Sequence, residues 1–273
     1  MLVAVRPPGE PLEQSTLVDA GSGLPYGTVP WWLTATIGML VTPEGAREIP
    51  LGYQDARHNL LGTQSRISFS PDGLTGSVVW SESGGGQRGH EARRRLRSAT
   101  PEERLDEMEL MCGKSGDFEV LKAEAPALED PASPFGLSCE GELLNVSVDM
   151  SQDEQAVGFA GPWIPRVPEF PSPVRVHPVV FPYPRTDISS FELAAPAGFA
   201  PRDPPPPVVL RTSFGAYSLR VAKTAEAFRV RRELVLPLLT VKAAEYPQLR
   251  QFLDDVRRAD ATMLEFGRLE PVP

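Results

Sequence analysis

Proline and glycine limit what this chain can fold into more than any other feature of its sequence. The 273 residues include 30 prolines and 23 glycines, about a fifth of the chain, and these follow no collagen-like period. Proline and glycine favour turns and extended backbone and interrupt regular helices. The sequence therefore predicts many short strands joined by turns, with few helices.

The clearest strand signals are two hairpins. Within residues 65–83, an Asp72-Gly73 step separates two runs in which apolar and polar residues alternate, and Asp-Gly is typical of a tight hairpin turn. Residues 217–236 hold two longer alternating runs around a short turn. Their pattern predicts an antiparallel hairpin with one buried face and one face in solvent.

Two helical regions are indicated between and after these hairpins. Thr100-Pro101-Glu102-Glu103 combines a capping box with proline at the first helical position, and an arginine-rich helix is expected just before it. A closing helix is predicted from about residue 243 to 259. Its apolar stripe consists of Tyr246, Leu249, Phe252, Leu253 and Val256.

These patterns predict an α+β fold that is predominantly β, with β-sandwich-like antiparallel modules and a few packed helices. Residues 1–50 hold three expected strands, which are too few to stand alone. Residues 51–165 are expected to form a β-rich module with a helix pair. Residues 166–273 should form a C-terminal β-sandwich-like module with the closing helix, after a proline-rich linker.

The charge and the motifs exclude several classes of function. A formal net charge of -9 argues against a nucleic-acid partner, because phosphate binding needs a basic face. No apolar run approaches the length of a membrane-spanning segment. The glycine-rich stretch 83–89 lacks the lysine-serine ending of a nucleotide-phosphate loop, so it predicts a flexible connector. We expect no cofactor.

The cysteines and histidines are few and scattered. Cys112 and Cys139 form no metal pattern, and a bridge between them is compatible with their number but not indicated by it. Each lies in an apolar pattern, so we expect two buried small side chains. The alternative is a nucleophile paired with His58, His90 or His177. The spacing of these histidines predicts no metal site.

Several short motifs resemble a known family. Leu17-Val18-Asp19-Ala20, followed by Pro25-Tyr26-Gly27-Thr28-Val29-Pro30, resembles bacterial transglutaminase-like proteins of the papain-type thiol superfamily. Arg175-Val176-His177-Pro178 and the later Leu193-Ala194-Ala195-Pro196-Ala197-Gly198 are similar to the strands of a second β-rich region in these proteins. Residues 231–236 and 245–250 resemble their final strand and helix.

The resemblance implies a place in a larger protein. Members of the family carry a cysteine, a histidine and an aspartate in that chain order, and Asp19 matches the aspartate that orients the histidine. No cysteine or histidine precedes Asp19 in this sequence. Residues 1–50 would then be the terminal strands of a transglutaminase-like core. Met1 to Val5 already reads as a strand within a sheet, as expected of a piece of a longer protein.

Three functions follow as expectations. The leading one is a non-catalytic C-terminal region that is accessory to an upstream cysteine-dependent core, with that core or another protein as its partner. The second is part of an active cysteine protease or transglutaminase-like enzyme, whose cysteine and histidine lie upstream of Met1. The third is an independent peptide- or glycan-binding β-sandwich module. The resemblance also implies a periplasmic or exported protein, and Asp19 is alternatively a simple strand-end aspartate.

Overall fold

A computed structural model shows the fold of most of the chain. It describes residues 2–5, 8–9, 15–19, 21, 23–52, 55–70, 75–113, 118–144, 147–151, 154–158 and 164–269. The Asp72-Gly73 turn and parts of the proline-rich linker lie outside these residues. The two strands that flank this turn nevertheless pair with each other in antiparallel register, as the sequence predicts.

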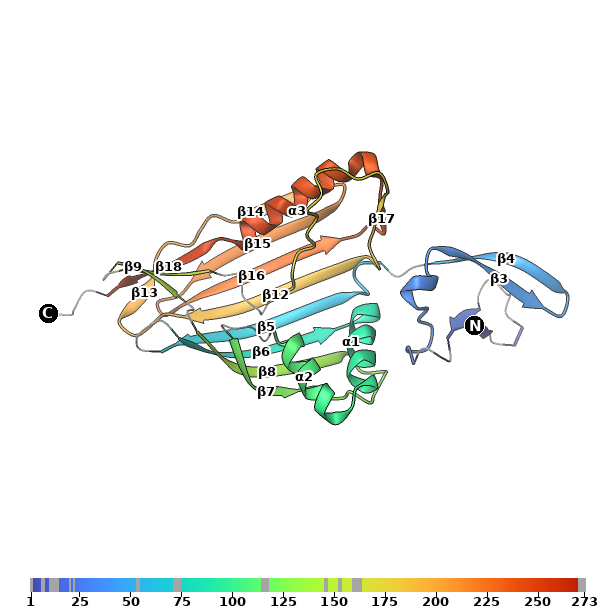
Figure 1. The fold of residues 1–273 in the computed structure, drawn as a ribbon, viewed down its shortest axis with the longest axis horizontal. Helices are drawn as coiled ribbons and strands as arrows, with labels where there is room; N and C mark the ends of the chain where they lie inside the picture. Colours follow the sequence, from blue (N-terminus) through green and yellow to red (C-terminus); the bar gives the residue numbers. More distant parts are fainter. Residues whose placement is uncertain are drawn as a thin grey trace.

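One eight-stranded sheet dominates the structure (Figure 1). Its strand order is β14-β15-β16-β12-β5-β6-β8-β7, and every neighbouring pair is antiparallel except β5 and β12, which run parallel. The strands are β5 (Leu60–Phe69), β6 (Gly76–Gly84), β7 (Phe118–Glu124), β8 (Phe135–Leu143), β12 (Arg185–Ala194), β14 (Val208–Thr212), β15 (Gly215–Lys223) and β16 (Ala227–Leu236).

In the part of the chain that the structure describes, four smaller sheets accompany it. Two of them are hairpins in the first fifth of the chain, and a third is a two-residue ladder. The fourth has the order β13-β18-β10-β9. Their strands are β1 (Val3–Val5), β2 (Thr16–Val18), β3 (Thr36–Thr42), β4 (Gly45–Leu51), β9 (Ser147–Ser151), β10 (Glu154–Gly158), β11 (Val179–Val180), β13 (Phe199–Pro201), β17 (Thr240–Val241) and β18 (Met263–Arg268).

The α-helices are α1 (Gly86–Ser98), α2 (Pro101–Met111) and α3 (Tyr246–Asp260), with short 3-10 turns η2 (Trp31–Leu33) and η3 (Ala243–Glu245). The capping box of α2 is confirmed, because the Thr100 amide donates to the Glu103 carboxylate at 2.9 Å and the Glu103 amide donates to the Thr100 hydroxyl. The closing helix begins at Tyr246, after η3. In the part of the chain that the structure describes, no helix has the length and apolar character that crossing a membrane requires.

The predicted fold class is confirmed: the chain is α+β and predominantly β. The large sheet is mixed, because two of its neighbouring strands, β5 and β12, run parallel; this pairing is here called the parallel seam. Strands of the expected 51–165 module and of the expected 166–273 module thus belong to one sheet. The division of the chain into three domains stays a prediction.

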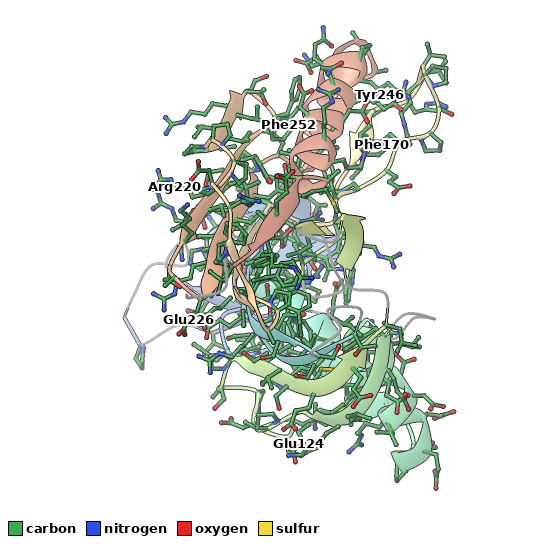
Figure 2. The ribbon with its side chains drawn as sticks, turned by 90° about the vertical axis from the view of Figure 1, so that its left-hand side faces the viewer. Glu124, Phe170, Arg220, Glu226, Tyr246 and Phe252 are labelled. Atoms are coloured by element: carbon green, nitrogen blue, oxygen red, sulfur yellow. A yellow bond between two sulfur atoms is a disulfide. The ribbon has the colours of Figure 1, made fainter. Side chains whose placement is uncertain are left out.

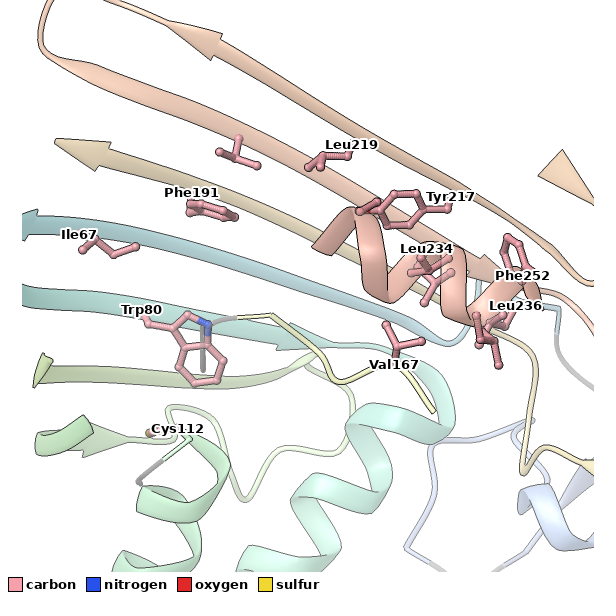
Figure 3. Close-up of a cluster of buried hydrophobic side chains, with 14 of the residues drawn as sticks. Ile67, Trp80, Cys112, Val167, Phe191, Tyr217, Leu219, Leu234, Leu236 and Phe252 are labelled. Carbon is pink, nitrogen blue, oxygen red and sulfur yellow. The ribbon is translucent and has the colours of Figure 1, made fainter. Parts of the chain in front are cut away.

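The core lies on one face of the large sheet, beneath the helices and the smaller β13-β18-β10-β9 sheet. Figure 3 shows side chains from five strands of the large sheet, from α3 and from the proline-rich segment gathered on this covered face. The rings of Phe228 and Phe266 meet edge to face, with centroids 5.1 Å apart, so β18 packs directly on β16. The opposite face carries most of the polar residues of the same strands.

A buried ion pair fixes the end of α3 to this face. The Arg232 side chain, fully buried on β16, donates to both Asp260 carboxylate oxygens, from Nε at 2.8 Å and from Nη2 at 2.9 Å. The Tyr217 hydroxyl donates to Asp260 Oδ1 at 2.7 Å. Removing one partner of such a pair leaves an uncompensated buried charge, which typically costs about 3–5 kcal/mol.

A disulfide ties α2 to the sheet, and it corrects the expectation for the cysteines. Cys112 follows α2, Cys139 lies on β8, and both are buried as expected, but their sulfur atoms are bonded to each other. The sequence spacing of 27 residues did not indicate this bond, because only the return of β8 beneath α2 brings the cysteines together. Neither cysteine has a free thiol in this form.

A row of polar side chains crosses the centre of the covered face. Thr63, Ser189 and Arg232 lie side by side on neighbouring strands, and the Thr63 hydroxyl donates to Ser189 Oγ at 2.9 Å. Glu82 continues the row on β6. Burial raises the pKa of Glu82, the Arg88 charge lowers it and the Asp187 charge raises it, with a net pKa of about 7.

We expect reduction of the disulfide to lower the free energy of unfolding by about 3–4 kcal/mol, because it releases a loop of about 28 residues in the unfolded state. Urea unfolding with and without a thiol reductant measures this. The double variant Cys112→Ala, Cys139→Ala should show the same loss and no response to reductant. Equal stability of the reduced and oxidised chains would contradict the expectation.

We expect Glu82 to make the protein less stable as the pH rises. Its folded-state pKa lies above the ordinary value of 4.5, so the folded state holds the proton more tightly than the unfolded state. That stability is fully present below pH 4.5 and is lost as the pH rises through about 7. The free energy of unfolding of Glu82→Gln, relative to that of the wild type, should therefore rise by about 2–3 kcal/mol from pH 5 to pH 8.

Denaturant unfolding at both pH values measures this difference. Glu142→Gln, on the exposed face of the neighbouring strand β8, is the matched control and should run parallel to the wild type. A Glu82→Gln curve that also runs parallel to the wild type would contradict the assignment.

Candidate functional site

Asp19 directly follows β2, at the end of the short β1–β2 hairpin. Its side chain is half-buried, and its Oδ1 accepts a hydrogen bond from the Gly21 amide at 3.1 Å. This contact is a local turn of the kind that aspartate forms with the backbone two residues on. The role of Asp19 as the residue that orients a histidine stays a prediction.

The three histidines lie in different surroundings. His58 Nδ1 is 2.8 Å from Asp55 Oδ1, and both side chains are exposed. The hydrogen bond from His58 lowers the pKa of Asp55. His90 is buried in α1, where burial and then the Arg94 charge lower its pKa, so its ring is neutral at pH 7. His177 is exposed in the proline-rich segment.

His58 and His90 line one cavity of about 240 Å³. The first turn of α1 forms one wall, residues 131–135 form another, and Pro25 and Thr28 of the N-terminal region close it. Arg93 also lines it, and its guanidinium donates to the backbone oxygens of Leu128 and Ser133. The two histidines are distant in the chain, and the sequence pattern did not predict that they line a common cavity.

Glycine is required where α1 begins. Gly86 has φ +55°, and a Cβ atom there would lie 2.5 Å from the His58 carbonyl oxygen. A Cβ atom on Gly89 would lie 2.2 Å from the Gly84 carbonyl oxygen. The glycine-rich stretch is thus a close-packed start of α1, whereas the sequence predicted a flexible connector.

No free thiol accompanies the two histidines that line the cavity. Asp55 holds the His58 imidazole as a carboxylate holds a general base. Both cysteines are bonded to each other, and neither lines the cavity. The Ser133 hydroxyl, which does line it, donates to Asp130 Oδ2 at 2.6 Å. Among the described residues, no group of three or more His, Cys, Asp or Glu side chains is arranged to hold a metal ion.

Gln87 fastens the N-terminal region to the rest of the chain beside this cavity. Its side chain is buried, donates to the Val29 carbonyl oxygen at 2.7 Å and accepts from the Trp31 amide at 3.0 Å. The backbone amide of Gln87 donates to Asn59 Oδ1, and Asn59 Nδ2 in turn donates to the Pro184 carbonyl oxygen at 2.8 Å. These bonds are here called the Gln87 clamp. The sequence did not predict them, because a glutamine in a glycine-rich stretch does not indicate which distant backbone atoms it will bind.

The N-terminal region has almost no core of its own. Among its described residues up to Leu51, only Thr28, Pro30 and Leu51 are buried. Seven of its large apolar side chains are exposed, among them three on one face of β3 that are each more than 60% accessible. These seven are Val3, Val5, Tyr26, Trp32, Ile37, Met39 and Val41. Figure 1 shows the β3–β4 hairpin projecting away from the large sheet.

Comparisons with known proteins give one family match. Residues 159–266 match a family described as a domain of unknown function with a solved structure (DUF3858), a stretch that runs from the proline-rich segment into β18. A search of curated proteins finds no match. A crystal structure of a candidate protease from Parabacteroides distasonis is similar at 11% identity and a TM-score of 0.35, over 85% of this chain and 68% of that protein.

Proposed function

We propose that this chain is a non-catalytic C-terminal region of a transglutaminase-like protein, which supports a cysteine-dependent core. The motifs around Asp19 and the DUF3858 match over residues 159–266 support this placement. The observation that carries the proposal is the N-terminal region, whose described residues bury almost nothing and expose seven large apolar side chains, five of them on strands. Such strands gain stability only when another body covers them.

The β3–β4 hairpin shows this need most clearly. Ile37, Met39 and Val41 alternate on one face of β3 and point into solvent. Covering one such side chain contributes about 1.5–3 kcal/mol, and a lone two-stranded hairpin is marginally stable in water. A β-rich core that packs on this face and pairs with the hairpin edges supplies both the apolar cover and the missing backbone partners.

The Gln87 clamp gives the region its supporting role. It joins the backbone at Val29 and Trp31 to the start of α1 through buried hydrogen bonds. Through Asn59 it continues to the backbone just before β12. A core that packs on the N-terminal strands is thereby held at a fixed place beside the large sheet.

Asp19 favours a second candidate, in which the region also completes the active site. Its carboxylate is held by the Gly21 amide at the end of a strand, a fitting position for orienting an imidazole from the core. The disulfide removes both cysteines of this chain as nucleophiles, so a reactive thiolate has to come from the core. The chemistry would then be cysteine-dependent attack on an amide carbon.

Hydrogen exchange tests the proposal. In the chain alone, the amides of β3 and β4 should exchange quickly while those of β12 and β16, at the centre of the sheet, stay protected. Adding a transglutaminase-like core that carries the cysteine and the histidine, as a separate polypeptide, should protect β3 and β4. Ile37→Arg with Val41→Arg should abolish this protection, and Arg47→Glu on β4 is the matched control.

Unchanged exchange of β3 and β4 with the core present would overturn the proposal. Asp19→Asn then separates the two candidates in the assembled complex. A supporting region leaves the turnover rate of the core unchanged. A loss of turnover by a factor of 100 or more, on the order seen when a general base is disabled, assigns Asp19 to the active site.

A further inference from the structure

The face of the large sheet that points away from the helices, here called the outer face, carries a basic cluster at one end. Arg220 on β15 lies directly opposite Arg231 on β16, and Figure 2 shows Arg220 on the side of the sheet away from α3. Neither guanidinium has an acidic partner among the described residues. Like charges directly opposite each other on paired strands destabilise a sheet.

The other end of the same face carries the opposite sign. Glu119 on β7 lies directly opposite Glu142 on β8, and both side chains are exposed. Glu140 and Glu124 lie beside them on the same face, with Lys122 as the one cation. This acidic cluster has a net charge of -3. Strands β12, β5 and β6 separate it from Arg220 and Arg231.

The basic cluster remains positive after its own ion pairs are counted. Arg66 and Arg229 both contact Glu192, at 3.6 and 3.0 Å. Glu233 lies one row along on β16. With Arg220 and Arg231, the cluster has a net charge of +2. The middle of the face is neutral and serine-rich, so the outer face is polarised along the strand order.

We propose that the outer face is a self-association surface, on which two copies of this chain pack face to face around a twofold axis. An axis that lies between the two faces, crosses the line joining the clusters at its midpoint and is perpendicular to that line places each copy's basic cluster on the partner's acidic cluster. Both like-charged cross-strand pairs, Arg220 with Arg231 and Glu119 with Glu142, then meet opposite charges.

The size of the face suits a dimer. Eight strands about 4.8 Å apart and about nine residues long, at about 3.3 Å per residue, give an area on the order of 1,000 Å². A stable interface buries about 800 Å² per partner. Face-to-face packing of two sheets with mean strand directions within about 30° is also a common arrangement.

A second copy fits better than an unrelated charged partner. A polyanion would bind the basic cluster but would be repelled by the acidic cluster on the same face, and a polycation would meet the reverse problem. The chain as a whole is acidic, at -9, so non-specific approach of two copies is unfavourable. Only a surface with both signs in matching places overcomes that repulsion.

Sedimentation velocity of the full chain tests the proposal through salt. We expect dimers at about 20 mM salt and monomers at about 1 M, because the Debye length falls to about 3 Å at the higher concentration. The chain should remain folded at both concentrations, as circular dichroism checks. A monomer at low salt and high protein concentration would overturn the proposal.

Charge reversal then tests the geometry. Arg220→Glu with Arg231→Glu makes both ends acidic, and Glu119→Arg with Glu142→Arg makes both ends basic, so each variant alone should be monomeric. An equal mixture of the two should form a heterodimer, which also shows that both variants are folded. The control is Glu102→Arg with Asp106→Arg on α2, at the opposite face, which should still dimerise.

Two outcomes contradict the proposal. Either variant dimerising alone would show that the clusters do not meet in the dimer. A mixture that stays monomeric while both variants melt within about 3 °C of the wild type would show that complementary charge on this face is not what joins the copies.

Discussion

The Arg232–Asp260 pair is the interaction on which the rest of the structure depends. It lies on the covered face, where a buried guanidinium needs a carboxylate partner. That partner, Asp260, is the last residue of α3. The pair therefore admits one placement of α3 on the sheet, and the apolar stripe of α3 follows from that placement. The Cys112–Cys139 bond does the same for α2 at the other edge. These two specific bonds thus fix α3 and α2 on a face whose other contacts are mostly apolar.

The described residues divide into a part with a shared core and a part with almost none. From β5 onward, the large sheet, its helices and the β13-β18-β10-β9 sheet share one core. Among the described residues up to Leu51, only Thr28, Pro30 and Leu51 are buried, and the Gln87 clamp ties this region to the rest of the chain. Polar groups are also segregated: on the covered face they form a row from Glu82 through Thr63 and Ser189 to Arg232, and on the outer face they are sorted by sign. This organisation fits a platform whose surfaces are completed by other molecules.

Local signals were readable from the sequence, and non-local ones were not. The hairpin within 217–236 and the capping box at Thr100 were predicted correctly, because each depends on residues close in the chain. The Cys112–Cys139 bond and the meeting of His58 with His90 depend on how distant strands assemble, and no spacing encodes that. Gln87 was missed because its hydrogen bonds reach backbone atoms about 57 residues away. Asp19 was found by resemblance, and the structure adds only its local turn.

The parallel seam between β5 and β12 also has a consequence for synthesis. Thr63 and Ser189 meet across it although 126 residues separate them in the chain. Contacts of such long range form slowly, because a large loop has to close before they give any stability. On the ribosome, strands β5 to β8 emerge well before β12, and until β12 arrives one backbone edge of β5 is unpaired. An unpaired edge of this kind can bind the wrong strand. The nascent chain is therefore most vulnerable to misassembly between the emergence of β5 and that of β12, and chaperones that shield strand edges would act in this interval.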